Sequence, residues 1–154
     1  MLSIGQKAPA FTLFNTEKQP VSLSSFSGQN LVILFFPLAF TSVCTAQLCR
    51  ARDNMNMYTK LNAKVVGISV DSPFALERFR EEQGLSFDLL SDFNKGVSKA
   101  YDCLYDTFVL GMEGVSKRAA FVVDGEGIIR HAEVLENAGM MPDFKALDDA
   151  LKAI

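Results

Sequence analysis

The feature that most constrains the fold is an uninterrupted apolar run from Leu31 to Phe36. Six apolar residues without alternation are typical of a strand covered on both faces, as in an α/β sheet. Pro37 ends the run, because proline cannot donate a hydrogen bond to a sheet ladder. A loop must follow, and Thr41 or Ser42 can then cap a helix that holds Cys44 in its first turn.

Cys44 is a candidate nucleophile because of this position. The first amides of a helix have no intrahelical partner and carry the positive end of the helix dipole, so a thiolate is favoured there over a thiol. The alternative is a buried structural cysteine that packs as a small hydrophobe. The helix is expected to continue to about Lys60, with an apolar face made by Cys44, Leu48, Ala51, Met55 and Tyr58.

The rest of the chain alternates strand and helix patterns, which predicts an α/β domain. Asp71-Ser72-Pro73 offers a helix cap, and Gly84 is the expected end of that helix. Asp102 to Val115 is expected to be irregular. The expected strands are 10–14, 21–23, 31–36, 65–70, 87–90, 118–123 and 128–134, and the expected helices are 44–60, 73–84, 93–101 and 141–154.

Length and charge restrict the class of protein. A chain of 154 residues suits one domain over 1–154, and a net charge of −3 without a basic cluster argues against nucleic acid or an anionic membrane as partner. We find no signal-peptide core and no run of membrane-spanning length, so a cytoplasmic protein is expected. Three cysteines in a reducing compartment indicate redox chemistry. One histidine, His131, gives too few zinc ligands, and no metal or cofactor is expected.

Pro37, Thr41 and Cys44 reproduce the Pro-x-x-x-Thr-x-x-Cys signature, and the whole chain resembles a peroxiredoxin of the AhpC/TSA family. The stretch from Cys44 to Cys49, followed by Arg52-Asp53, is similar to the bacterioferritin comigratory protein (PrxQ) subgroup. Residues 114–121 are similar to the one-Cys, alkyl hydroperoxide reductase E-like branch. The resemblance implies a thioredoxin-like fold with an N-terminal β-hairpin extension and a central mixed sheet flanked by helices.

The resemblance also implies a thiol-dependent peroxidase that reduces hydrogen peroxide and organic hydroperoxides, with Cys44 becoming a sulfenic acid. Thr41 would hold the peroxide in line with sulfur, because a hydroxyl donates and accepts at once, although it could be a plain helix cap. The amides of Val43 and Cys44 would bind the substrate. Pro37 would shield the thiolate from water, although it could simply end the strand.

Arg118 matches the active-site arginine of the family, and a fixed cation suits the negative charge that develops on the departing oxygen. Lys117 is its neighbour and could be mistaken for it, but alternation along a strand places the two side chains on opposite faces. Gln47 stands where the family often has glutamate, and is expected either to hydrogen-bond at the site or to lie on the helix surface. Apolar residues 108–112 are expected to line the pocket or to anchor a buried loop.

The resemblance favours Cys49 as the resolving cysteine, with Cys103 and an external thiol as alternatives. Five residues along an ideal helix separate two Cα atoms by about 8–9 Å, so a disulfide between Cys44 and Cys49 requires local unwinding. A thioredoxin or glutaredoxin-like reductant would then regenerate the thiols of a monomer or homodimer. A non-enzymatic redox sensor or holdase is the reading from another functional class, since a sensor needs only a reactive thiol.

Overall fold

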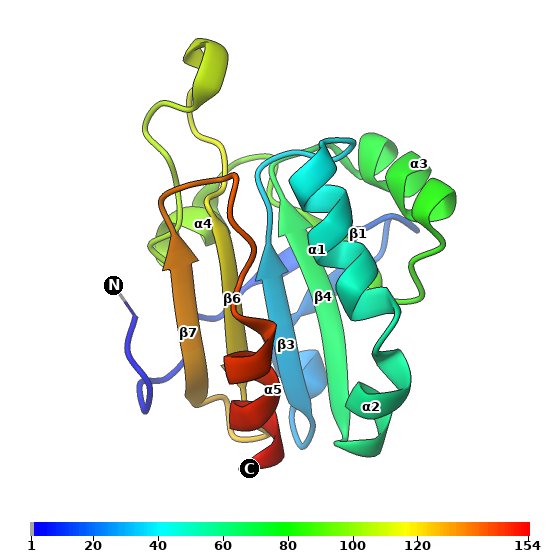
Figure 1. Ribbon diagram of the computed structural model, residues 1–154, viewed down its shortest axis with the longest axis vertical. Coiled ribbons are helices and arrows are strands. Elements are labelled where there is room, and N and C mark those ends of the chain that lie inside the picture. The colour runs from blue at the N-terminus through cyan, green and yellow to red at the C-terminus, as the bar shows by residue number, and fades with distance from the viewer. Residues whose placement is uncertain (1) are drawn as a thin grey trace.

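The computed structural model describes residues 2–154, which form a seven-stranded mixed sheet in the order β2-β1-β5-β4-β3-β6-β7 (Figure 1). The central strands β3, β4 and β5 are parallel, and the other pairs are antiparallel. This arrangement confirms the α/β class and the thioredoxin-like fold. The strands are β1 (Thr12–Asn15), β2 (Pro20–Ser22), β3 (Asn30–Phe35), β4 (Ala63–Ser69), β5 (Asp88–Ser91), β6 (Arg118–Val123) and β7 (Ile129–Leu135).

The N-terminal hairpin β1–β2 extends the same sheet, because β1 pairs antiparallel with the edge strand β5. The helices pack on both faces of the sheet. They are α1 (Ser42–Arg52), α2 (Met55–Lys60), α3 (Pro73–Gln83), α4 (Gly96–Ala100) and α5 (Phe144–Lys152), with short 3-10 turns η1 (Leu23–Phe26) and η2 (Val109–Gly111).

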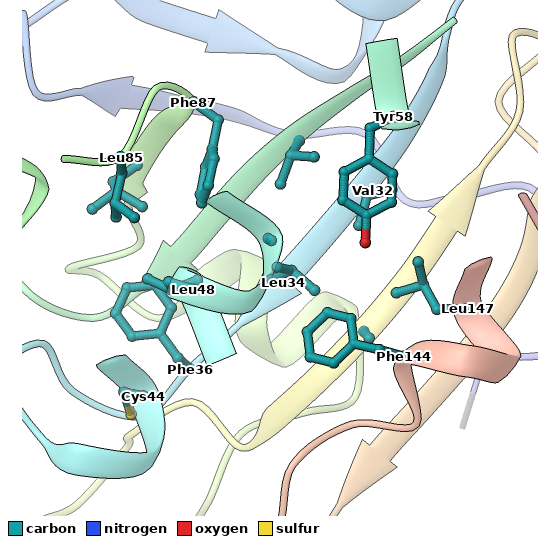
Figure 2. Packing of buried hydrophobic residues seen from close by; sticks show 14 of the residues in the cluster. Val32, Leu34, Phe36, Cys44, Leu48, Tyr58, Leu85, Phe87, Phe144 and Leu147 are labelled. Atoms are coloured by element: carbon teal, nitrogen blue, oxygen red, sulfur yellow. The ribbon is translucent and has the colours of Figure 1, made fainter. Parts of the chain in front are cut away.

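Strand β3 separates two hydrophobic clusters, as its apolar pattern predicts. Val32 and Leu34 pack with α1, α2, α3 and α5 on one face, while Leu31 and Ile33 pack with α4 and the N-terminal segment on the other. All four side chains are at most 1% exposed. Figure 2 shows the first cluster, in which Cys44 lies at the end nearest the start of α1. A strand buried on both sides is the rigid support on which the cysteine loop is built.

The helix expected to continue from Cys44 to Lys60 is interrupted, and this part of the prediction is wrong. Helix α1 ends at Arg52, and α2 starts at Met55. The Asn54 side chain donates to the carbonyl of Arg50 at 2.7 Å, so an asparagine competes with the helix backbone at the break. The apolar spacing in the sequence runs on past the break because Tyr58 of α2 is buried in the same cluster as the apolar residues of α1.

Capping residues in the sequence predicted the ends of α3 correctly, whereas the bounds expected for the two later helices were too wide. Ser72 accepts from the amide of Ala75, Pro73 is the first residue of α3, and Gly84 ends the helix with a φ of 60°. The helix expected at 93–101 contains only α4, whose first amides bind the Asp92 carboxylate. The closing helix is shorter than expected and begins at Phe144.

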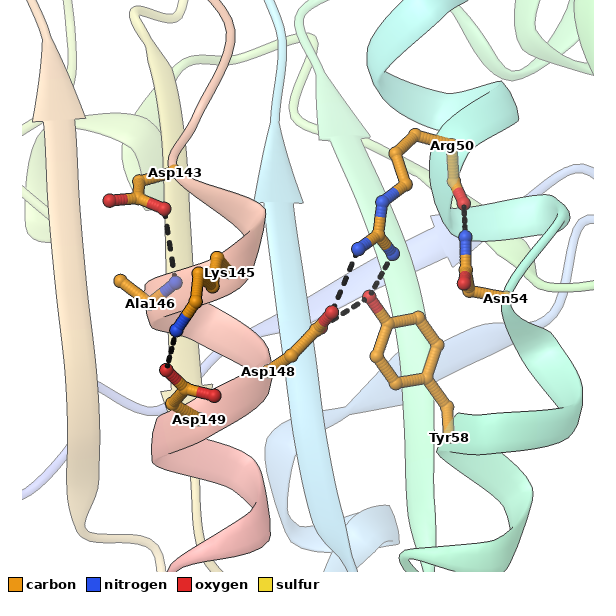
Figure 3. A network of polar contacts seen from close by, with 8 residues as sticks. All are labelled: Arg50, Asn54, Tyr58, Asp143, Lys145, Ala146, Asp148 and Asp149. Carbon is orange, nitrogen blue, oxygen red and sulfur yellow. Dashed lines mark hydrogen bonds and ion pairs between the residues drawn. The ribbon is translucent and has the colours of Figure 1, made fainter.

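A polar network joins three helices on the Cys44 side of the sheet (Figure 3). Arg50 of α1 forms an ion pair with Asp148 of α5 at 2.7 Å. Tyr58 of α2 donates its hydroxyl to the same carboxylate at 3.1 Å, and burial raises the pKa of this tyrosine. These contacts fix the carboxyl-terminal half of α1 relative to the core.

No helix within residues 2–154 is long and apolar enough to cross a membrane.

Candidate active site

Cys44 lies in the first turn of α1, just beyond the end of β3. The first intrahelical backbone bond runs from the amide of Thr45 to the carbonyl of Thr41 at 2.9 Å. The amides of Ser42, Val43 and Cys44 precede it and have no partner within the helix. Cys44 is only 1% exposed, so its sulfur lies at the positive end of a helix in a region of low water content.

Arg118 contacts this cysteine from the neighbouring strand. Its Nη1 lies 3.3 Å from Cys44 Sγ, and the residue is 2% exposed. Successive side chains of β6 point to opposite faces of the sheet, which explains the contact. Arg118 points the same way as Ala120 and Val122, which pack in the cluster that contains Cys44. Ala119 and Phe121 face the other cluster. Lys117 points elsewhere and pairs with Glu136.

Gln47 is a buried part of the site rather than a surface residue. Its Oε1 accepts a hydrogen bond from Arg118 Nη1 at 2.8 Å, and its Nε2 donates to the carbonyl of Phe35 at 3.3 Å. The second bond fixes which end of the amide meets the guanidinium. Gln47 is neutral, and within residues 2–154 no carboxylate forms an ion pair with Arg118. The buried cation therefore has the Cys44 sulfur as its nearest ionisable neighbour.

The remaining acceptor of Arg118 is a backbone carbonyl that sequence reasoning missed. Ala138 O accepts from Nε at 3.2 Å and from Nη2 at 2.8 Å. Ala138 lies in the loop that connects β7 with α5, at the same end of the sheet as the start of α1 (Figure 1). A carbonyl leaves no side-chain signal in the sequence, so only the fold reveals this contact.

The loop before α1 holds the other residues expected at the site. Pro37 is buried, whereas Thr41 is exposed and its hydroxyl donates to the carbonyl of Leu38 at 2.9 Å. The Thr41 side chain therefore forms no helix-capping bond, although Thr41 is the N-cap residue. Val43 is half-buried at the same turn. Asp71 steadies the loop by accepting from the amide of Ala39 at 2.8 Å, a contact that sequence reasoning also missed.

The other two cysteines lie in different places. Cys49 is half-buried on α1, where its sulfur is 3.5 Å from Gln83 Oε1 of α3. Cys103 is fully buried in the cluster on the opposite face of the sheet, and burial raises the pKa of its thiol. The fold brings neither sulfur into contact with Cys44, and all three cysteines are free thiols.

The expectation that residues 108–112 line a pocket or anchor a buried loop is wrong. This segment projects from the body of the molecule (Figure 1), and Leu110 is 95% exposed. Within residues 2–154, no group of three or more His, Cys, Asp and Glu side chains is placed to hold a metal ion.

A cysteine at a helix start, in contact with a buried arginine on the same face of a thioredoxin-like sheet, is the arrangement expected of a thiol-based oxidoreductase. The AhpC/TSA family matches residues 4–132, and the chain belongs to this family of peroxiredoxins, which are thiol peroxidases.

Named relatives include both subgroups that the sequence resembles. The chain is 36% identical over 157 residues to alkyl hydroperoxide reductase E of Mycobacterium tuberculosis, covering 100% of this chain and 99% of that protein. It is 37% identical over 132 residues to peroxiredoxin Bcp of Escherichia coli, covering 84% of each. The crystal structure of peroxidoxin BcpB from Mycobacterium tuberculosis matches with a TM-score of 0.88 and 25% identity, covering 100% of this chain and 99% of that one.

Proposed function

We propose that Cys44 is the peroxidatic cysteine and reduces hydrogen peroxide and organic hydroperoxides. Its thiolate attacks one oxygen of the O–O bond, an S–O bond forms, and the O–O bond breaks. The departing oxygen takes the electron pair and a proton and leaves as water or an alcohol, while Cys44 becomes a sulfenic acid. The observation that carries the proposal is the 3.3 Å contact of Arg118 Nη1 with Cys44 Sγ.

Arg118 has two roles in this reaction. Before the attack its charge favours the thiolate, because Gln47 and the Ala138 carbonyl are neutral acceptors and leave the positive charge uncompensated. During the attack its planar fork offers donors to the oxygen on which charge develops. The free amides at the start of α1, including those of Val43 and Cys44, add donors on the other side of the sulfur.

Thr41 and Pro37 complete the proposed site. The Thr41 hydroxyl is exposed and donates to the Leu38 carbonyl, so its oxygen lone pairs remain available to accept from a peroxide O–H. Pro37 is buried beside this loop and brings no N–H of its own, which limits the water that can solvate the thiolate. Together these residues hold the peroxide while Arg118 and the helix amides stabilise its charge.

The sulfenic acid is proposed to be resolved by Cys49, in a disulfide that a thioredoxin or glutaredoxin-like donor reduces. Both cysteines lie in the continuous helix α1, whose geometry holds their Cα atoms about 8–9 Å apart, too far for a disulfide. The first turns of α1 must therefore unwind. Arg50 is anchored to Asp148, so we place the limit of unwinding at residue 49. The intact helix in turn supports a second candidate, resolution by an external thiol as in a one-Cys enzyme.

The decisive experiment measures hydroperoxide consumption by Cys44→Ser, with dithiothreitol as the reductant. We expect turnover to be lost, since a hydroxyl at this position cannot form a sulfenic acid. Cys103→Ser is the matched control and should retain the parent rate, because Cys103 lies on the opposite face of the sheet. Undiminished turnover by Cys44→Ser would remove Cys44 from the mechanism. If the parent protein itself consumed no hydroperoxide, a redox sensor would be favoured instead.

A further inference from the structure

The guanidinium of Arg118 is oriented by one backbone carbonyl. Two of its nitrogens, Nε and Nη2, donate to Ala138 O at 3.2 Å and 2.8 Å, while Nη1 faces Cys44 and Gln47. A planar fork held on one edge has its opposite edge fixed in direction. The Ala138 carbonyl on one edge and Gln47 on the other therefore together set where Nη1 lies relative to the sulfur.

A tight turn at residues 137–140 sets the direction of that carbonyl. The amide of Met140 donates to the carbonyl of Asn137 at 3.1 Å, and the Asn137 side-chain oxygen accepts from the amide of Gly139 at 2.9 Å. An asparagine that binds the backbone two residues ahead forms an Asx turn, which stabilises a reverse turn locally. Both bonds enclose the peptide unit between Ala138 and Gly139, which carries the carbonyl that meets Arg118.

Gly139 shows how closely the Asn137 side chain fits the turn. A Cβ atom added to Gly139 would lie 3.1 Å from Asn137 Oδ1, so even alanine would press on the oxygen that holds the turn. The loop is also tied at both ends, because Tyr105 donates to the Glu136 carbonyl at 2.6 Å and the Asp143 amide donates to Glu133 at 2.8 Å. Between these ties, the Asn137 side chain is the local support of the turn.

From these contacts we propose that Asn137 is a positioning residue for the peroxidase reaction, acting on Cys44 through the Ala138 carbonyl and Arg118. The inference rests on the proposed role of Arg118. Asn137 itself is exposed, so its side chain adds little to the hydrophobic core. A loss of rate on its removal would therefore report the orientation of the guanidinium.

The test compares the second-order rate constant for oxidation of Cys44 by hydrogen peroxide among matched variants. We expect Asn137→Ala to lower it about tenfold, less than loss of Arg118 but on the scale of a misplaced reacting group. Asn137→Asp keeps an oxygen that can accept from the Gly139 amide and should return the rate to within about twofold of the parent. Gly139→Ala should behave like Asn137→Ala, and Asn94→Ala, an exposed loop asparagine, should behave like the parent.

A second readout separates positioning from a general structural effect. In an Arg118→Ala background, Asn137→Ala should cause no further loss, since the residue acts through Arg118.

Each outcome then has one meaning. A parent-like rate for Asn137→Ala, beside a large loss for Arg118→Ala, would overturn this inference and leave the proposed function intact. Equal losses from Asn137→Ala with and without Arg118 would also overturn it, because the effect would bypass the guanidinium. A parent-like rate for Arg118→Ala would instead contradict the proposed function itself.

Discussion

Arg118 and Cys44 lie 74 residues apart in the sequence, yet Nη1 of one is 3.3 Å from Sγ of the other. Antiparallel pairing of β6 with β3 brings them together, since Ala119 lies opposite Phe35 at the point where β3 ends and the cysteine loop begins. The arginine therefore starts one strand and the cysteine follows the end of its neighbour. The site depends on the register of this one strand pair.

Replacing Arg118 with alanine should reduce the rate of Cys44 oxidation by roughly 10² or more, the usual effect of losing one fixed charge-stabilising donor. Lys117→Ala is the matched control, because Lys117 has the same charge and adjoins Arg118 but pairs with Glu136 instead. Rapid-quench kinetics with sulfenic acid trapping would measure both. A rate for Arg118→Ala within twofold of the parent would remove this arginine from the site.

After one equivalent of peroxide, peptide mapping under non-reducing conditions should show a disulfide between Cys44 and Cys49. The reason is that Cys49 can reach Cys44 when the first turns of α1 unwind, while Cys103 is buried across the sheet. Cys103→Ser should give the same link. A 44–103 disulfide would contradict this prediction, and a sulfenic acid cleared equally well by thiols in Cys49→Ser would establish the one-Cys mechanism.

Asp148→Ala should lower the free energy of unfolding by about 2 kcal/mol, because it leaves the half-buried Arg50 and the fully buried Tyr58 without their shared carboxylate. Urea denaturation followed by circular dichroism would measure the change. Asp149→Ala is the control, because the exposed ion pair of Asp149 with Lys145 should contribute little to the free energy of unfolding. If both substitutions had the same small effect, the network in Figure 3 would not stabilise the domain.

Stability should fall as the pH drops below about 6.5, the ordinary pKa of histidine, in a way that depends on His131. Burial is the main cause that lowers the pKa of His131 in the folded protein, against the opposing charges of Glu133 and Asp143. The unfolded chain therefore binds this proton more readily, so protonation favours unfolding and stability rises with pH through that range. His131→Gln should flatten the slope between pH 5 and 7, and parallel unfolding curves for the two proteins would refute the assignment.

Sequence reasoning was accurate where a local signal determines the structure. The apolar run 31–36 predicted β3, and Ser72 and Gly84 marked the ends of α3 within a residue. The alternation of β6 correctly separated Arg118 from Lys117. These features depend on residues adjacent in the chain, whose preferences for burial or backbone conformation are visible without the rest of the molecule.

The features that were missed or left open depend on residues distant in the chain. Gln47 was expected either to hydrogen-bond at the site or to lie on the helix surface, and only the proximity of Arg118 and the Phe35 carbonyl decides for a buried bridge. The contact of the Ala138 carbonyl with Arg118 leaves no signature in the sequence, because every residue has a backbone carbonyl. The break between α1 and α2 was hidden because Tyr58 keeps the spacing of the apolar face after the helix has stopped.

Because Cys103 is buried on the opposite face of the sheet, the rate at which its thiol reacts reports how often the whole domain unfolds. Cys103 is 0% exposed, and burial raises the pKa of its thiol, so an alkylating reagent meets a reactive sulfur there only after the surrounding core has separated. In a Cys44→Ser, Cys49→Ser protein, the labelling rate at Cys103 would count unfolding events under fully native conditions. The chain thus carries, within its own core, a reporter of its conformational lifetime.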